Sequence, residues 1–373
     1  MNYAETIKER TKEPAAIEVQ PRARVRLMPE YHPPLGQRDR VRLDFNENTL
    51  ACSPAVKTAI EHVSAADLTR YPERGPVEAL AAKHLGLDVS QVVLTNGVDE
   101  AIHVLCQAFL DAGDELLLPV PTYTMYEIYA SATDATIRHV PAGAGFRFPF
   151  ETLLGAITPK TKIIVIANPN SPTGTVCTRE QIVAIAEAAP QALVLVDEAY
   201  FHFFGETVMD LISELPNLIV ARTFSKAYGL AALRLGLLAG SESLLRWVRR
   251  VLSPYSVNSI ALVALTAALD DHSYVDWYVS QVKEARSWFL ARLTRIGLQF
   301  WPTEANFVLI NVGPSHKEFV ATMREKGILV RDRSSDPGCE GCVRITIGTP
   351  EQMRHALGAI EDFLTSQSGG ACA

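Results

Sequence analysis

Short aliphatic runs alternate with longer amphipathic segments from about Ser53 onward, whereas the first 45 residues are rich in charges and prolines. This alternation is typical of a parallel sheet whose strands are joined by helices. Runs without any polar residue, such as ALVLV, indicate strands that are buried on both faces of the sheet. The predicted strands are residues 92–95, 115–118, 162–167, 192–196, 218–221 and 235–239. The predicted helices between them are residues 98–110, 123–132, 179–188 and 242–252.

The pattern changes after Pro254, which indicates a second, smaller structural unit. We expect an α/β fold in which a large domain is followed by a small α+β domain. The elements expected in the small domain are helices at 259–269 and 275–293, strands at 307–312, 328–331 and 343–347, and a closing helix at 352–364. The expected divisions are 1–50 for an N-terminal arm with a small-domain segment, 51–257 for the large domain and 258–373 for the small domain.

Composition excludes several classes of function. The 35 basic and 42 acidic residues give a net charge of -7 without a polybasic run, which argues against a nucleic-acid partner. The apolar runs are far shorter than the roughly 20 residues that span a bilayer, and the N-terminus lacks the apolar core of a signal peptide. Six sparse cysteines do not form a disulfide framework, and the pair Cys339 and Cys342 lacks the second pair that a zinc site needs. We therefore expect a cytoplasmic protein without a metal.

The segment TFSKAYGLAALRLG, residues 223–236, carries the most chemical information. Lysines are mostly exposed, but Lys226 stands between two apolar strands and should lie close to the core. A lysine that is partly removed from water can act as a nucleophilic amine and form a Schiff base with an aldehyde. Arg234, Thr223 and Ser225 could hold a phosphate through charge-assisted hydrogen bonds.

Three other segments place polar residues at strand ends, where open α/β sheets bind ligands. NPNSPTG (168–174) is a rigid loop that can present amide side chains to a ring. VDEAY (196–200) ends a buried strand with Asp197, which could pair with a protonated pyridine nitrogen or simply cap a helix. TNGVDEA (95–101) joins a strand to a helix through a glycine turn, and its free N–H groups can bind an anion.

Taken in this order, the four segments resemble those of the fold-type I pyridoxal phosphate aminotransferases, within the histidinol-phosphate aminotransferase branch. The resemblance extends from about Tyr31 to Leu364. Further segments that carry it are LDFNENT (43–49), RYPE (70–73), PTYTMY (121–126), DEAYFHF (197–203), EANFVL (304–309) and VRITIGT (343–349). It implies a large domain with a mostly parallel seven-stranded sheet between helices, and a homodimer with shared active sites.

The resemblance also implies roles for individual residues. Lys226 would hold pyridoxal 5'-phosphate covalently and later move the proton of the substrate α-carbon. Asp197 would bind the ring nitrogen, and Tyr200 the ring hydroxyl. The remaining cofactor contacts would come from the backbone of Val98 and Asp99, the ring face of Tyr123, the side chains of Thr223, Ser225 and Arg234, and Tyr71 of the neighbouring subunit. The family's usual asparagine before Pro-Thr-Gly is replaced by Ser171, so either Asn170 substitutes for it or Tyr200 binds the ring hydroxyl alone.

On the substrate side, Arg344 resembles the arginine that binds the α-carboxylate, although an arginine at the start of a strand could also be a solvated edge charge. Arg331, with Arg333 as a weaker candidate, matches the arginine that holds the substrate phosphate. Tyr31 and Asn48 align with residues near the substrate entrance. The expected reaction is transamination between histidinol phosphate and 2-oxoglutarate. Two alternatives remain open: an aminotransferase for phenylalanine or tyrosine, and a decarboxylase resembling threonine-phosphate decarboxylase.

The first prediction concerns Lys226. The purified protein should be yellow, its visible absorbance should vanish on borohydride treatment, and peptide mass mapping should find the modification on Lys226. Lys226→Ala should weaken cofactor binding and abolish transamination, because the amine that moves the proton is lost. Modification of a different lysine would show that the assignment is wrong.

Overall fold

The computed structural model describes residues 19–33, 35–36 and 39–370, and the side chains up to residue 367. The chain divides after Pro33 into two units. In the first unit, α1 (Ala23–Arg26) is a single helical turn with no buried residue. The predicted arm therefore lies partly outside the described residues, and the fold that follows belongs to the second unit.

A seven-stranded sheet forms the centre of the second unit, as predicted, with the strand order β2-β8-β7-β6-β5-β3-β4. All neighbouring strands are parallel except β8, which runs antiparallel to both β2 and β7. The strands are β2 (Val92–Thr95), β3 (Glu115–Val120), β4 (Thr136–Pro141), β5 (Thr161–Ala167), β6 (Leu193–Asp197), β7 (Leu218–Thr223) and β8 (Gly236–Gly240).

Six of these strands match the predicted ones within a few residues, but β4 was not predicted. Its sequence, TIRHVP, carries charged residues and ends in a proline, and most of its side chains remain partly exposed. These features suit the edge of a sheet, where one side of the strand has no neighbour. An edge strand of this kind lacks the continuous apolar run that identified the central strands.

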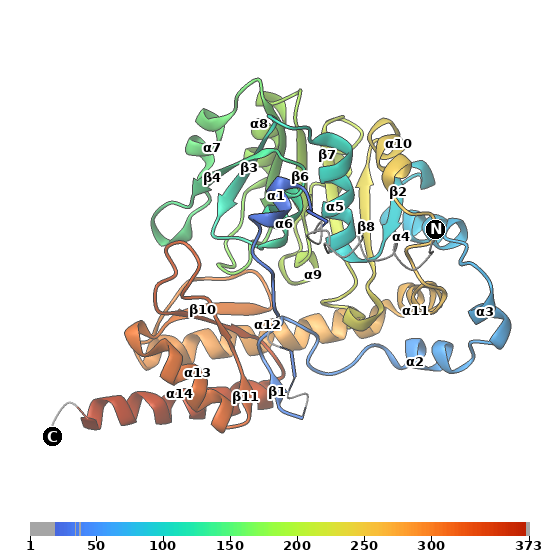
Figure 1. Cartoon of the computed structure of the whole chain (residues 1–373). Coiled ribbons are helices and arrows are strands. Elements are labelled where there is room, and N and C mark those ends of the chain that lie inside the picture. The colour runs from blue at the N-terminus through green and yellow to red at the C-terminus, as the bar shows by residue number, and fades with distance from the viewer. Residues whose placement is uncertain (1–18, 34, 37–38, 371–373) are drawn as a thin grey trace, which may run out of the picture. The chain divides into compact units, whose positions relative to one another are not determined.

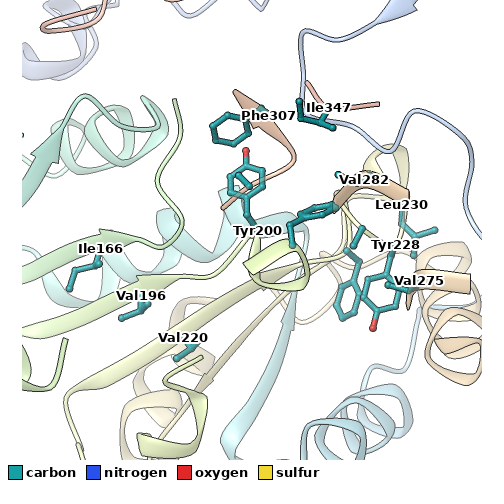
Figure 2. Close-up of a cluster of buried hydrophobic side chains, with 14 of the residues drawn as sticks. Ile166, Val196, Tyr200, Val220, Tyr228, Leu230, Val275, Val282, Phe307 and Ile347 are labelled. Carbon is teal, nitrogen blue, oxygen red and sulfur yellow. The ribbon is translucent and has the colours of Figure 1, made fainter. Parts of the chain in front are cut away.

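Successive residues of the central strands enter two separate cores, one on each face of the sheet. Ile166, Val196 and Val220 lie side by side on β5, β6 and β7 and face the larger core (Figure 2). The helices that pack on this face are α4 (Gly75–Leu85), α8 (Arg179–Ala188), α11 (Ser259–Asp270) and α12 (His272–Arg295). The opposite face is covered by α5 (Gly97–Phe109), α6 (Met125–Ser131) and α10 (Glu242–Val251).

A four-stranded antiparallel sheet with the order β12-β13-β10-β9 follows the long helix α12 in the chain (Figure 1). Its strands are β9 (Gln299–Phe300), β10 (Phe307–Asn311), β12 (Arg331–Asp332) and β13 (Cys342–Thr346). The accompanying helices are α13 (His316–Glu325) and α14 (Pro350–Gly370). The division between the large and the small domain at residue 258 remains a prediction.

The strand predicted at 328–331 is interrupted, which corrects that expectation. Ile328 and Leu329 form β11, which pairs in parallel with β1 (Val41–Arg42), whereas Arg331 begins β12 and pairs with β13. The chain passes from one sheet to the other at Val330. The remaining helices of the second unit are short, namely α2 (Pro54–Glu61), α3 (Ala65–Thr69), α7 (Phe150–Ala156) and α9 (Phe201–Phe204).

The start of α5 packs directly against the start of β8, and this contact requires a glycine. A Cβ atom on Gly236 would lie 2.7 Å from the backbone carbon of Gly97 and 2.8 Å from the nitrogen of Val98. Neither backbone atom can move without displacing the first turn of α5. Gly97 itself has a φ of 77°, a conformation that other residues adopt only with strain.

Gly236→Ala should therefore destabilise the protein by about 1–3 kcal/mol, as overpacking of a rigid contact does. Gly155→Ala is the matched control, because Gly155 lies in α7 with open space around its Cα. The control should be neutral or more stable by about 0.5–1 kcal/mol, since alanine favours helix. Urea unfolding of both variants checks this prediction, and equal stabilities would contradict it.

Candidate active site

Lys226 lies in the loop that follows β7, as the sequence predicts, and its side chain is directed toward another part of the chain. Its Nζ donates a hydrogen bond of 3.0 Å to the carbonyl oxygen of Phe45 and lies 5.8 Å from the centre of the Tyr200 ring. Asn48 donates through Nδ2 to the carbonyl oxygen of Ala227, the residue after the lysine, at 3.2 Å. The segment around Phe45 and Asn48 thus forms one wall beside the amine.

Asp197 is the last residue of β6, and its side chain is almost completely buried. Its Oδ2 accepts a 2.6 Å hydrogen bond from the hydroxyl of Tyr126, and its Oδ1 accepts from the backbone nitrogen of Ala199 at 3.0 Å. Burial raises the pKa of Asp197 to about 6, while these two hydrogen bonds lower it; Asp99 and Glu198 add smaller upward contributions. A cation placed against this carboxylate would favour its charged form.

Tyr126 is a site residue that the sequence reasoning did not single out. Burial, followed by the charge of Asp197, raises its pKa well above the usual value, so the phenol remains a hydrogen-bond donor. It was detectable only as part of the segment PTYTMY, in which Tyr123 was chosen instead.

Tyr200 contacts a second asparagine that the sequence reasoning also missed. Its hydroxyl accepts a 2.9 Å hydrogen bond from Nδ2 of Asn46. Asn46 has a φ of 54° and is held by Thr346, whose hydroxyl accepts from the Asn46 backbone nitrogen, and by Asn306, whose Nδ2 donates to its carbonyl oxygen. The ring of Tyr200 meets Phe307 edge to face at 5.0 Å, as the close-up shows (Figure 2). Asn46 and Asn306 both lie in segments that carried the resemblance.

The first turn of α5 and Arg234 form a cradle suited to an anion. Asn96 begins the helix without a side-chain cap, which leaves backbone N–H groups such as that of Val98 directed out of the helix end. Arg234 contacts Asp99 at 3.0 Å through Nη2 and Ser225 at 3.4 Å through Nη1. The hydroxyl of Thr223, next to them, accepts from the backbone nitrogen of Ser225.

Tyr123 and Asn170 are near this cradle, but each has local partners. The Tyr123 hydroxyl donates to Oδ1 of Asp99 at 2.8 Å, and its ring meets Tyr126 edge to face. Nδ2 of Asn170 donates to the carbonyl oxygen of Pro121 and to Thr173, and its Oδ1 accepts from Thr122. The Asn170 amide is thus hydrogen-bonded within its own loop. The asparagine that donates to the Tyr200 hydroxyl is Asn46, and a cofactor contact by Asn170 remains a prediction.

Arg344 is a buried cation on β13. Its Nη1 donates to the hydroxyl of Ser171 at 2.9 Å and its Nη2 to the carbonyl oxygen of Asp44 at 2.7 Å. Within the described residues, its buried Nε has no hydrogen-bond partner. Burial, with smaller contributions from the nearby guanidinium groups of Arg333 and Arg331, lowers the pKa of Arg344 to about 10. Ser171, the departure from the family loop, is therefore a ligand of this guanidinium.

Arg331 stands directly opposite Arg344 on the neighbouring strand β12. Like charges in this position repel one another, so the pair indicates a place for anions. The Arg331 guanidinium carbon lies 5.5 Å from the centre of the Phe45 ring, while the carbonyl oxygen of Phe45 accepts the hydrogen bond from Lys226. Arg333, the weaker candidate, forms an ion pair with Asp336.

One predicted residue of the second unit, Tyr71, lies away from this cluster. Tyr71 is 77% exposed and stacks on Tyr255 with ring centres 4.5 Å apart. Tyr31 belongs to the first unit, so its place near the substrate remains a prediction. In the described part of the chain, no cluster of three or more His, Cys, Asp or Glu side chains could hold a metal ion, and no helix is long and apolar enough to cross a membrane.

These residues fit pyridoxal phosphate. A buried carboxylate suits a protonated ring nitrogen, and the first turn of α5 with Arg234 suits a phosphate. Lys226 provides an amine that an aldehyde can capture, and the unpartnered Nε of Arg344 suits a substrate carboxylate. The open α/β sheet, with its polar residues at the carboxyl ends of the parallel strands, is thus organised like that of a cofactor-dependent enzyme.

Residues 38–360 match the family described as aminotransferase class I and II, and the chain belongs to this family. It is 36% identical over 342 residues to a histidinol-phosphate aminotransferase of Geobacillus sp., covering 88% of this chain and 91% of the relative. In fold it is similar to the histidinol-phosphate aminotransferase of Sinorhizobium meliloti, solved in complex with pyridoxal-5'-phosphate (TM-score 0.85, 24% identity, 94% and 99% coverage). It is also similar to L-threonine-O-3-phosphate decarboxylase of Porphyromonas gingivalis (TM-score 0.78, 23% identity, 87% and 99% coverage).

Asp197→Asn should increase the stability of the cofactor-free protein at alkaline pH. Because folding raises the pKa of this carboxyl from 3.8 to about 6, the folded state opposes its ionisation. The resulting destabilisation is absent below about pH 4, grows as the pH rises, and is complete above about pH 6. The variant should therefore gain about 1–3 kcal/mol at pH 8 and nothing at pH 4, measured by urea unfolding.

Asp67→Asn is the control, because its effect on stability at pH 8 should have the opposite sign. Hydrogen bonds from Ser64 lower the pKa of Asp67, so its carboxylate stabilises the protein above pH 4. This variant should lose stability at pH 8 relative to pH 4. If Asp197→Asn behaved in the same way, the Asp197 carboxylate would be stabilised rather than strained by its surroundings.

Proposed function

We propose that this chain is a pyridoxal-phosphate-dependent aminotransferase that exchanges amino groups between histidinol phosphate and 2-oxoglutarate. The observation that carries the substrate choice is the pair Arg331 and Arg344, which face one another on neighbouring strands beside Phe45 and Lys226. Two cations suit the charges of both reaction partners, since histidinol phosphate carries a phosphate with nearly two negative charges and 2-oxoglutarate carries two carboxylates. The relatives named histidinol-phosphate aminotransferase, at 36% identity over most of both chains, support the same substrate.

Different residues would hold different parts of the cofactor. Arg234, Ser225, Thr223 and the N–H groups of α5 would bind the phosphate. When bound, the cofactor supplies an aldehyde that carries the amino group and a ring that accepts the electrons released at the substrate α-carbon. The Asp197 carboxylate would keep the proton on the ring nitrogen, and Tyr126 would hold that carboxylate in place.

The remaining residues would act on the substrate. Nζ of Lys226 would remove the proton from the α-carbon and return it at the adjacent cofactor carbon, because no other amine of the cluster is placed beside Tyr200. Arg344 would bind the α-carboxylate of 2-oxoglutarate or of its amino-acid product through its buried Nε, which has no partner among the described residues. Arg331 would bind the phosphate of histidinol phosphate and, in the other half of the reaction, the second carboxylate of 2-oxoglutarate.

A homodimer is part of this proposal. Tyr71 would reach the cofactor phosphate of the neighbouring subunit, and its high exposure together with the stacked ring of Tyr255 supports a contact beyond this chain. An exposed aromatic pair of this kind is typical of protein interfaces. A cytoplasmic location remains a prediction.

Arg331→Ala separates the phosphate substrate from an aromatic amino acid. Loss of a charge-assisted contact in a partly desolvated site costs about 1.5–3 kcal/mol, so KM for histidinol phosphate should rise about 10- to 150-fold. Turnover of phenylalanine, which has no distal charge, should be unchanged or improved. The measurement is steady-state kcat/KM for histidinol phosphate, phenylalanine and tyrosine, each with 2-oxoglutarate.

Arg344→Ala is the control, because phenylalanine and tyrosine carry an α-carboxylate and histidinol phosphate does not. It should lower kcat/KM for the two amino acids more than for histidinol phosphate, the reverse of the result expected for Arg331→Ala. Equal losses for every substrate in Arg331→Ala would instead favour an aromatic aminotransferase, and release of carbon dioxide in place of a keto product would favour a decarboxylase.

A further inference from the structure

The segment between β12 and β13 consists of three consecutive tight turns, and the last of these turns contains two cysteines. Backbone hydrogen bonds join Asp336 to Arg333 at 2.9 Å, Cys339 to Asp336 at 3.0 Å and Cys342 to Cys339 at 2.8 Å. The Arg333 nitrogen then donates to the carbonyl oxygen of Cys342 at 3.0 Å, which closes the segment on itself. Cys339 and Cys342 are thus the first and fourth residues of the last turn.

This turn brings the two thiols together. The first and fourth Cα atoms of a hydrogen-bonded turn lie within about 7 Å, which overlaps the range of about 4.4–6.8 Å found across disulfides. The interaction between the two thiols lowers the pKa of Cys342 and raises that of Cys339, so Cys342 is the more nucleophilic sulfur.

A pocket lies beside the cluster that contains this pair. Both cysteines are buried in a small cluster with Phe146 and Leu309, against which Trp301 packs. Phe146, Trp301 and Gly338 also line a pocket of about 290 Å³, and Gly338 directly precedes Cys339. The pocket borders the cluster that encloses the sulfurs, so a peroxide that enters it must displace these side chains to reach a sulfur.

The other described thiols have no second cysteine nearby in the chain. Cys52 is partly exposed, whereas Cys106 and Cys177 are buried, and burial raises the pKa of both, that of Cys106 to about 12. A thiol buried alone is unreactive, whereas Cys339 and Cys342, which are also buried, form a pair within one turn. A metal is not the explanation for the pair either, because the described residues bring no third ligand of the kind that zinc requires to Cys339 and Cys342.

We propose that Cys339 and Cys342 form a reversible disulfide on exposure to a hydroperoxide, and that this bond alters the hairpin that carries Arg331 and Arg344. The Cys342 thiolate attacks the peroxide, so that an S–O bond forms, the O–O bond breaks and water leaves. The Cys339 sulfur then attacks the resulting sulfenic acid, so that the S–S bond forms and a second water leaves. Two thiols are oxidised, one peroxide is reduced to two waters, and a dithiol reverses the change.

Formation of the disulfide would displace Arg344 and Arg333 through the backbone that connects them to Cys342. A disulfide holds its two sulfur atoms at about 2.05 Å, so its formation pulls Cys342 at the start of β13 toward Cys339. Arg344 follows two residues later on the same strand, and Arg333 is bonded to the Cys342 carbonyl oxygen. Because interiors are closely packed, a displacement at this point shifts the guanidinium groups beside it.

Peptide mapping under non-reducing conditions tests the disulfide in the intact wild-type enzyme. Glu340 lies between the two cysteines, so a glutamate-specific protease separates them unless a disulfide joins the fragments. After hydrogen peroxide treatment we expect the joined fragments, a mass loss of two hydrogen atoms, and reversal by dithiothreitol. Cys106→Ala, the matched buried-thiol control, should give the same result, whereas Cys339→Ala and Cys342→Ala should not. Separate fragments carrying sulfinic acid would overturn the proposal.

The functional consequence rests on the proposed function and is measured separately. A displacement of about 1 Å in positioning groups costs up to about 100-fold, so we expect kcat/KM for histidinol phosphate to fall about 10-fold or more in oxidised enzyme and to recover on reduction. A variant lacking both cysteines should show no such response. An unchanged kcat/KM in fully joined enzyme overturns the link to the hairpin. Failure of reduced enzyme to accept histidinol phosphate contradicts the proposed function instead, and the peptide map still decides the disulfide.

Discussion

A buried ion pair between the ends of two central strands holds the catalytic edge of the sheet together. Glu198 follows β6, Arg222 lies near the end of β7, and their charged atoms are 2.6 Å apart with both side chains almost completely buried. Thr207 contacts both partners, and the Arg222 guanidinium covers the ring of Phe201. Removing one partner of such a pair leaves a buried charge without compensation, which typically costs about 3–5 kcal/mol. The pair therefore fixes the neighbouring residues on both strands.

Those neighbours include residues proposed to bind the cofactor. Asp197 directly precedes Glu198, and Thr223 directly follows Arg222 on the way to Lys226. Asp197 is also in register with Ala221, so the carboxylate and the lysine loop start from adjacent points of one sheet edge. Both faces of the sheet are filled by apolar side chains, so the ends of the strands are where polar groups avoid burial among apolar neighbours. The candidate site lies at one of these ends.

The substrate side depends on a different sheet. The antiparallel register of β12 and β13 places Arg331 opposite Arg344, although thirteen residues separate them in sequence. Phe45 then joins this pair to the lysine, since its ring faces Arg331 and its carbonyl oxygen accepts from Lys226. A phosphate or a carboxylate of a small molecule can thus be bound while the reacting carbon stays near the amine. Proximity of this kind is a large part of catalysis.

Much of this organisation could be predicted from the sequence, because it depends on local pattern. Continuous apolar runs identified six strands of the central sheet, and the structure places Asp197 at the end of β6 and Lys226 and Arg234 between β7 and β8, as expected. Contacts between distant segments were not predictable in this way. Three hydrogen bonds of the site join residues that are 71 or more positions apart in the sequence. They link Asn46 to Tyr200, Tyr126 to Asp197 and Ser171 to Arg344. The sequence alone determined which strands form the central sheet and which polar residues stand at their ends. Tertiary structure decided which side chains pair there, because strand register and the packing between separate elements set the distances between those side chains.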